Sequence, residues 1–137
     1  MKRISTFLII ALLTLFFVSG CSKQEKADKL IAVNADEIDK IICTGRNGGE
    51  DGSFEYSLTE SEIDDFVKLL NEVSLGDEVD KNEALSSGAV VYYTVQFTDD
   101  KTLEISPGEY FMVGGTYYRF KNFDELWDEF IKFNSLR

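Results

Sequence analysis

Hydrophobic and polar residues alternate along several short stretches of the chain, and a period of two residues predicts β-strands. The longest stretch covers 89–98 and gives a strand with one apolar face and one polar face. The apolar face carries Val91, Tyr93, Val95 and Phe97, and the polar face carries Tyr92, Thr94 and Gln96. Shorter stretches of the same kind lie at 38–44, 54–58, 102–105, 110–113 and 116–120. The turn pairs Asp99-Asp100, Pro107-Gly108 and Gly114-Gly115 join the last four strands as antiparallel neighbours.

Two other stretches repeat their hydrophobic residues with the period of an amphipathic helix. The first begins at Thr59-Glu60-Ser61-Glu62, a capping-box motif in which the side chains of Thr59 and Glu62 each bond the backbone amide of the other residue. The second begins at Asn122, a residue type that is also favoured at helix N-caps. The apolar faces carry Ile63, Phe66, Val67, Leu70 and Val73 in the first helix, and Phe123, Leu126, Trp127, Phe130 and Ile131 in the second.

These elements follow one another in the order β-β-α-β-β-β-β-α, which predicts a single α+β domain over 36–137. An antiparallel sheet of about five to six strands can offer one apolar face to both helices, so we expect the two helices to lie on the same side of the sheet. The stretch 77–88 is rich in acidic residues and is expected to be a polar connection between the first helix and the longest strand.

The first twenty residues have a different pattern. Lys2 and Arg3 precede an almost wholly apolar run over 4–18, and small residues follow it. This is the pattern of a secretory signal peptide. The apolar run is shorter than the roughly 20 residues that a transmembrane helix needs, so a permanent membrane span is the weaker interpretation.

The end of this run, Val18-Ser19-Gly20-Cys21, resembles the lipobox of bacterial membrane lipoproteins at all four positions. The resemblance implies transfer of a diacylglyceryl group to the Cys21 thiol, cleavage after Gly20, and a lipidated cysteine as the new N-terminus. Residues 1–20 are then a removed signal peptide, 21–35 a lipid-anchored flexible tether, and 36–137 the folded domain. The implied location is the extracytoplasmic side of the cell membrane. The alternative is an ordinary signal peptide with a cysteine after its cleavage site by chance.

Acidic residues outnumber basic ones, and this excludes some partners. Loss of Lys2 and Arg3 with the signal peptide takes the net charge from −11 to about −13. Nucleic acid is therefore not expected as a partner, because phosphate binding needs an excess of Lys and Arg. Acidic lipid headgroups also repel such a domain. We therefore expect the lipid on Cys21, rather than the protein surface, to hold the domain at the membrane. Cys43 lies in an apolar run and is expected to be a buried core residue rather than a reactive thiol.

The chain contains few of the residue types and motifs that carry most catalytic chemistry. The chain has no histidine, the commonest general base and metal ligand, and no Gly-x-Ser-x-Gly or Cys-x-x-Cys motif. The EF-hand pattern of calcium loops is also missing. We therefore expect no catalytic residues, no metal, no cofactor and no enzymatic activity. A small exported hydrolase that uses paired carboxylates is the least favoured alternative.

The candidate binding residues are aromatic and lie on the predicted sheet face that points away from the helices. If Tyr93 points inward, Tyr92 points outward, and the same alternation places Tyr117 and Arg119 outward, where Tyr110 can join them. Exposed aromatics among polar neighbours are typical of contact surfaces, so we expect a module that binds an envelope or surface protein. Two alternatives remain: a glycan- or solute-binding lipoprotein, and tyrosines present only because tyrosine favours strands.

Overall fold

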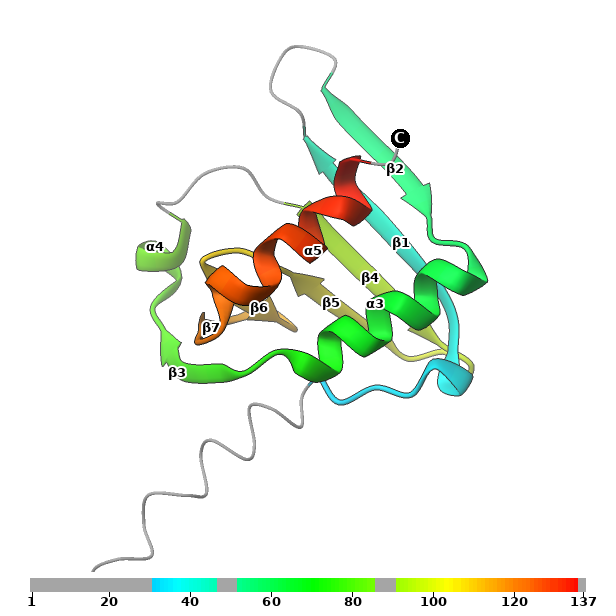
Figure 1. The fold of residues 1–137 in the computed structure, drawn as a ribbon, viewed down its shortest axis with the longest axis horizontal. Coiled ribbons are helices and arrows are strands. Elements are labelled where there is room, and N and C mark those ends of the chain that lie inside the picture. The colour runs from blue at the N-terminus through cyan, green and yellow to red at the C-terminus, as the bar shows by residue number, and fades with distance from the viewer. Residues whose placement is uncertain (1–30, 47–51, 86–90, 136–137) are drawn as a thin grey trace, which may run out of the picture.

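The structure, a computed structural model, describes residues 31–46, 52–85 and 91–135. These residues form one seven-stranded sheet with the strand order β2-β1-β4-β5-β6-β7-β3 (Figure 1). The strands are β1 (Ile38–Arg46), β2 (Ser53–Ser57), β3 (Leu75–Val79), β4 (Val91–Phe97), β5 (Thr102–Ser106), β6 (Tyr110–Val113) and β7 (Thr116–Phe120). Every neighbouring pair is antiparallel. The sheet therefore contains the predicted meander, β4 to β7, as its continuous central part.

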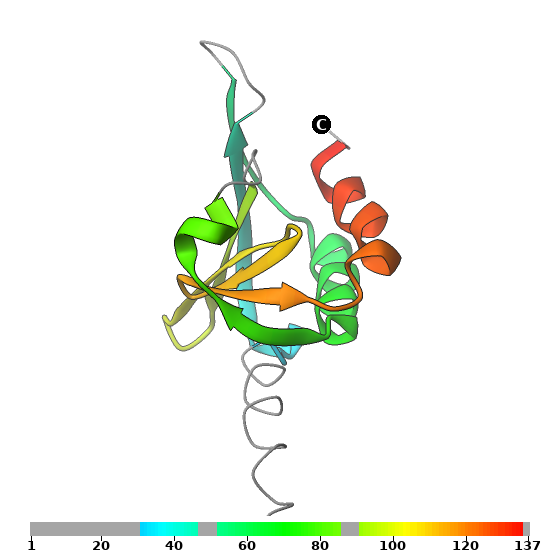
Figure 2. The same ribbon diagram turned by 90° about the vertical axis from the view of Figure 1, so that its left-hand side faces the viewer.

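Three α-helices and one 3-10 turn accompany the sheet in the described ranges. They are η2 (Ala35–Glu37), α3 (Glu60–Glu72), α4 (Lys81–Ala84) and α5 (Phe123–Ser135). Helices α3 and α5 lie side by side on one face of the sheet, and α4 lies on the opposite face (Figure 2). The predicted α+β class, with both amphipathic helices on one face, is confirmed.

The predicted strand count was too low, and the interpretation of 77–88 as a polar connection was wrong. Part of that stretch belongs to β3, which pairs with β7 at the edge of the sheet through Leu75 and Phe120 and through Val79 and Tyr117. The amide of Lys121 also donates to the carbonyl of Ser74 at 2.9 Å. These long-range backbone bonds hold the segment as a strand despite its acidic sequence.

The core lies between the sheet and the two long helices and is rich in aromatic rings. Phe66 of α3 is fully buried, with its ring centroid 4.5 Å from that of Tyr93 and 6.0 Å from that of Phe130. The predicted core position of Cys43 is confirmed, and Cys43 lies next to Tyr93. Burial of the Tyr93 phenol is the main cause that raises its pKa, and its contact with Cys43 adds to the shift. Ile31, the first described residue, is 1% exposed and belongs to the same core. The packed part of the chain thus already includes Ile31.

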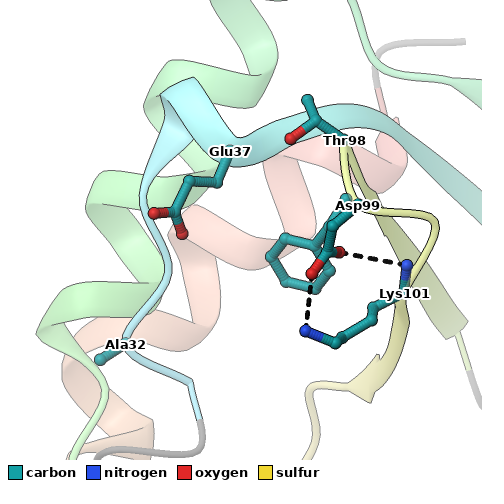
Figure 3. A pocket seen from close by; sticks show the side chains of 6 residues that line it. Ala32, Glu37, Thr98, Asp99 and Lys101 are labelled. Atoms are coloured by element: carbon teal, nitrogen blue, oxygen red, sulfur yellow. Dashed lines mark hydrogen bonds and ion pairs between the residues drawn. The ribbon is translucent and has the colours of Figure 1, made fainter.

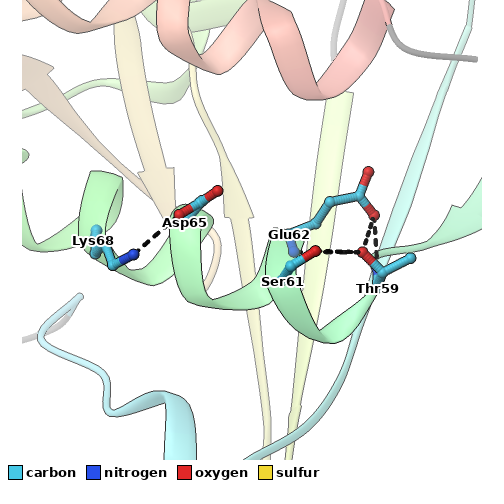
Figure 4. A network of polar contacts seen from close by, with 5 residues as sticks. All are labelled: Thr59, Ser61, Glu62, Asp65 and Lys68. Carbon is cyan, nitrogen blue, oxygen red and sulfur yellow. Dashed lines mark hydrogen bonds and ion pairs between the residues drawn. The ribbon is translucent and has the colours of Figure 1, made fainter.

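The predicted capping box at the start of α3 is confirmed. The amide of Thr59 donates to Glu62 Oε2 at 2.7 Å, and the amide of Glu62 donates to Thr59 Oγ1 at 3.4 Å (Figure 4). One turn further along, Lys68 pairs with Asp65 at 3.0 Å on the exposed side of the helix. The boundary of α3 was thus readable from local sequence.

The start of α5 is fixed in a different way from the one expected. The side chain of Asn122 is directed to the connection between α3 and β3 rather than to its own helix. Its Oδ1 accepts from the amide of Ser74 at 2.9 Å, and its Nδ2 donates to the carbonyl of Glu72 at 2.9 Å. One side chain thereby joins the end of α3, the start of β3 and the start of α5.

The β4–β5 hairpin contains a strained residue whose replacement should stabilise the protein. Phe97 and Lys101 close a three-residue loop in which Asp100 has a φ of 65°. An L-residue pays about 1 kcal/mol for this left-handed conformation, and glycine does not. We expect Asp100→Gly to raise the free energy of unfolding by about 0.5–1 kcal/mol, as measured by urea denaturation.

Asp99→Gly is the matched control for this prediction. Asp99 does not have a positive φ, and its carboxylate pairs with the Lys101 ammonium at 2.6 Å. Glycine there should give no gain in stability. Equal gains from both variants would contradict the role of backbone strain at Asp100.

Candidate functional site

The four predicted binding residues all lie on the sheet face opposite α3 and α5, which we call the outer face. Tyr92 is on β4, Tyr110 on β6, and Tyr117 and Arg119 on β7. Strand alternation sets this placement, because the neighbouring residues Tyr93, Phe111 and Phe120 are buried in the core. Gly20 and Cys21 lie outside the described residues. The outer-face side chains used below are Lys40, Thr44, Glu55, Tyr92, Thr94, Gln96, Glu104, Ser106, Tyr110, Met112, Tyr117 and Arg119.

Two of the predicted tyrosines lie in one row across the outer face. Tyr92 is the partner of Thr44 on β1, and Met112 is the partner of both Ser106 and Tyr117. Tyr92 and Ser106 are adjacent across β4 and β5, because the next pair along is Tyr93 and Ile105. The row therefore reads Thr44, Tyr92, Ser106, Met112, Tyr117 from β1 to β7.

The tyrosines of this row are half-buried rather than fully exposed. Burial, followed by the nearby Tyr92 phenol and the Glu104 carboxylate, raises the pKa of Tyr117. The Tyr117 phenol therefore stays neutral at physiological pH. The side chains of Tyr92 and Tyr117 each offer an apolar ring together with a hydroxyl that can donate or accept a hydrogen bond.

The other two predicted residues form a separate cluster with Glu83 of α4. Tyr110 and Arg119 are cross-strand partners, and the guanidinium carbon of Arg119 lies 6.0 Å from the centroid of the Tyr110 ring. The Tyr110 hydroxyl donates to Glu83 Oε1 at 3.0 Å, and Arg119 Nη2 lies 3.7 Å from the same oxygen. This hydrogen bond to Glu83 raises the pKa of Tyr110.

Helix α4 was missed in the sequence, and it changes the shape of the candidate site. Val79, Ala84 and Met112 are buried, yet none of them belongs to the main core under α3 and α5. Val79 and Met112 flank Tyr117 across the strands, and Ala84 belongs to α4, which lies on the outer face (Figure 2). The predicted aromatic surface is therefore divided into an open part around Tyr92 and a part beside α4. The Asp80 side chain, which accepts from the amide of Asn82 at 2.9 Å, was the one local signal for this helix.

Charge separates the outer face from the helix layer. On the outer face of the strands, Lys40 and Arg119 balance Glu104 and Glu55, the partner of Thr44 on β2, and the row from Thr44 to Tyr117 carries no charge. Helices α3 and α5 carry nine acidic side chains and two lysines. The acids are Glu60, Glu62, Asp64, Asp65, Glu72, Asp124, Glu125, Asp128 and Glu129. The acidic excess of the protein is thus concentrated on the helix side, and the outer face is the less charged surface.

A wide hollow of about 740 Å³ lies beside η2 and the β4–β5 turn (Figure 3). Glu37, Phe97, Asp99 and Lys101 are among the residues that line it. The Lys101 ammonium and backbone amide both bond the Asp99 carboxylate, at 2.6 and 3.2 Å, and this pair raises the pKa of Lys101 and lowers that of Asp99. Both side chains are largely exposed, so the pair is solvated and not arranged around a ligand.

Within the described ranges, no three acidic, cysteine or histidine side chains are grouped so that they could hold a metal ion. The helices of those ranges also include none that is long and apolar enough to cross a membrane. No family model, curated protein or solved structure matches this chain.

Proposed function

We propose that the chain is a lipoprotein anchored to the extracytoplasmic side of the cell membrane through Cys21, and that its folded domain binds another protein of the envelope or cell surface. The anchor is supported by the signal-peptide pattern and by the match of Val18-Ser19-Gly20-Cys21 to the lipobox. Two or more acyl chains give stable attachment, whereas one chain binds a membrane only marginally.

The uncharged row on the outer face is the observation that carries the binding role. Tyr92 lies beside Thr44, and Tyr117 lies between Met112 and Val79, so both tyrosines have uncharged cross-strand neighbours on a protein where charge is otherwise dense. Interface cores are depleted of charge and enriched in Tyr, Met and Arg. A sheet face of this composition suits the surface of another protein.

The proposed role is non-catalytic and needs no cofactor. The chain has no histidine, and its helix-side carboxylates are accounted for by helix termini and solvent exposure. The acidic excess argues against nucleic acid as the partner.

Mass spectrometry of the native protein extracted in detergent tests the anchor. We expect the mature chain to begin at Cys21 with a diacylglyceryl modification, and we expect Cys21→Ala to leave the precursor unmodified and uncleaved after Gly20. A released, unmodified mature chain would refute the lipoprotein assignment.

Replacement of Tyr92 and Tyr117 tests the binding surface. We expect the double variant Tyr92→Ala, Tyr117→Ala to lose at least tenfold in affinity for the protein that crosslinks to the wild-type chain on intact cells. Aromatic residues of this kind are frequent energetic hot spots of interfaces. Binding is measured by pull-down from detergent extracts, with thermal melting to show that the variant is folded.

Ile131→Ala is the control, because it removes an apolar side chain that is 38% exposed on the helix side. It should leave capture unchanged. Retention of capture by the tyrosine variant, or loss caused only by unfolding, would argue against the outer face. Retention of the wild-type chain on purified wall glycan, with no protein captured, would favour the glycan-binding alternative.

A further inference from the structure

A groove runs between α3 and α5 on the side of the molecule away from the outer face. Its volume is about 490 Å³. It is lined from α3 by Glu62, Asp65, Leu69 and Glu72, and from α5 by Glu129 and Phe133, among others. Figure 1 shows the two helices in front of the sheet, and Figure 2 shows them on the same side of it. The lining positions run from 62 to 72 on α3, so the groove follows this helix.

The floor of this groove is apolar and held in place. Leu69 is 7% exposed, and Phe133 is half-buried with its ring edge-on to the buried ring of Phe66 at 5.3 Å. The backbone carbonyl of Phe133 accepts a hydrogen bond from the Tyr56 hydroxyl of β2. The floor therefore exists before any ligand binds, which lowers the entropic cost of association.

The rim of the groove has an excess of negative charge. It holds four carboxylates and two ammonium groups, those of Lys68 and Lys132. Lys68 pairs with Asp65 and Lys132 pairs with Glu129, each within its own helix. An occupant that brings positive charge would therefore complement the rim, and an acidic occupant would be repelled.

The spacing along α3 indicates the shape of the occupant. The α3 positions that line the groove are 62, 65, 68, 69 and 72, and neighbours along its face are three or four residues apart. This is the spacing of one stripe along a helix, and a second helix laid along it presents its own side chains at the same intervals. The stripe from Glu62 to Glu72 is about 15 Å long, at about 1.5 Å per residue.

We infer that this groove binds a cationic amphipathic helix of a partner protein. Lysines or arginines of that helix, spaced three or four residues apart, meet the rim carboxylates of Glu62, Glu72 and Glu129. The apolar side chains between them lie on Leu69 and Phe133. This site is separate from the outer face, so its failure would leave the proposed function untouched.

A designed peptide tests the inference with the full chain in nonionic detergent. The probe is an immobilised 14-residue helical peptide of leucine, alanine and lysine, with its lysines at helical spacing on one face. Binding is measured by biolayer interferometry, with empty micelles as the reference. We expect saturable binding that weakens at least tenfold in the variant Glu72→Lys, Glu129→Lys.

The matched control is Asp64→Lys, Asp128→Lys, which changes the net charge equally at exposed positions of the same two helices outside the groove lining. It should weaken binding no more than threefold, and both variants should melt as the wild type does. Equal weakening by the two variants would show only general attraction between opposite charges and would overturn the inference. Equal binding of a peptide with the same lysines and leucines but with proline in place of central alanines would also overturn it, because the occupant would not be a helix.

Discussion

Replacement of Phe66 by alanine is expected to lower the free energy of unfolding by about 3–5 kcal/mol, the usual cost of removing a buried phenylalanine side chain. Phe66 is fully buried and contacts three other rings, those of Tyr93, Phe130 and Phe133. These rings come from β4 and α5, so the cavity would open between the sheet and both helices. Chemical denaturation with two probes, tryptophan fluorescence and far-UV circular dichroism, measures the loss.

The loss caused by Phe66→Ala should be a large fraction of the free energy of unfolding of a domain, which is typically about 5–15 kcal/mol. Leu85→Ala is the control, because Leu85 is 47% exposed and its removal should change stability by no more than about 0.5 kcal/mol. If Phe66→Ala cost as little as Leu85→Ala, the rings around Phe66 would not form the centre of the core.

Replacement of Asn122 by alanine is expected to cost about 2–3 kcal/mol. The variant loses both side-chain bonds, to the amide of Ser74 and to the carbonyl of Glu72. Each backbone group left without a partner away from water costs about 1–3 kcal/mol, and the lower values apply here because the site is only partly buried. Urea denaturation measures this loss, and amide exchange should show faster exchange at Ser74.

Two further variants separate the loss of the two Asn122 hydrogen bonds from a general effect of removing an asparagine. Asn71→Ala lies on the exposed side of α3 and should be neutral or slightly stabilising, because alanine favours helices. Asn122→Asp keeps the acceptor for Ser74 but loses the donor to Glu72, so about half of the loss should return. A neutral Asn122→Ala variant would mean that the start of α5 is fixed by its apolar face alone.

The central strands and both long helices were predictable because local pattern and tertiary packing agree there. In β4, each residue expected inward packs on the core, as Tyr93 and Val95 do at 1% and 0% exposure. The capping box at Thr59 marks the start of α3 by side-chain chemistry that needs no tertiary partner. Where the two levels agree, one sequence suffices.

Strand β3 could not be predicted because its pairing is not local. Its sequence, Leu-Gly-Asp-Glu-Val, contains three residues that are depleted in strands and shows no clean alternation. The acidic side chains suit an edge position, where charge discourages further pairing. Gly76 allows a close approach of the strands, because a Cβ atom there would lie 3.0 Å from Cβ of Arg119 on β7. These features favour a strand only once the pairing of β3 with β7 is known.

The candidate site was predictable in part for the same reason. Alternation placed Tyr92, Tyr110, Tyr117 and Arg119 on the outer face correctly. It gave no sign that Glu83 would pair with two of them, because the four residues of α4 are too few to show a helical period. The division of the aromatic surface follows from that contact between α4 and β7.

The position of β1 bears on how the domain would carry mechanical load. Ile31 enters the core at one end of the molecule, and the chain then runs through η2 into β1, which pairs with β2 on one side and β4 on the other (Figure 1). Antiparallel inter-strand bonds lie perpendicular to the strands. A pull along β1 from its N-terminal end therefore strains both ladders at once instead of opening them bond by bond. Under the proposed anchorage through Cys21, the strand closest to the anchor would be the one that resists traction on the domain.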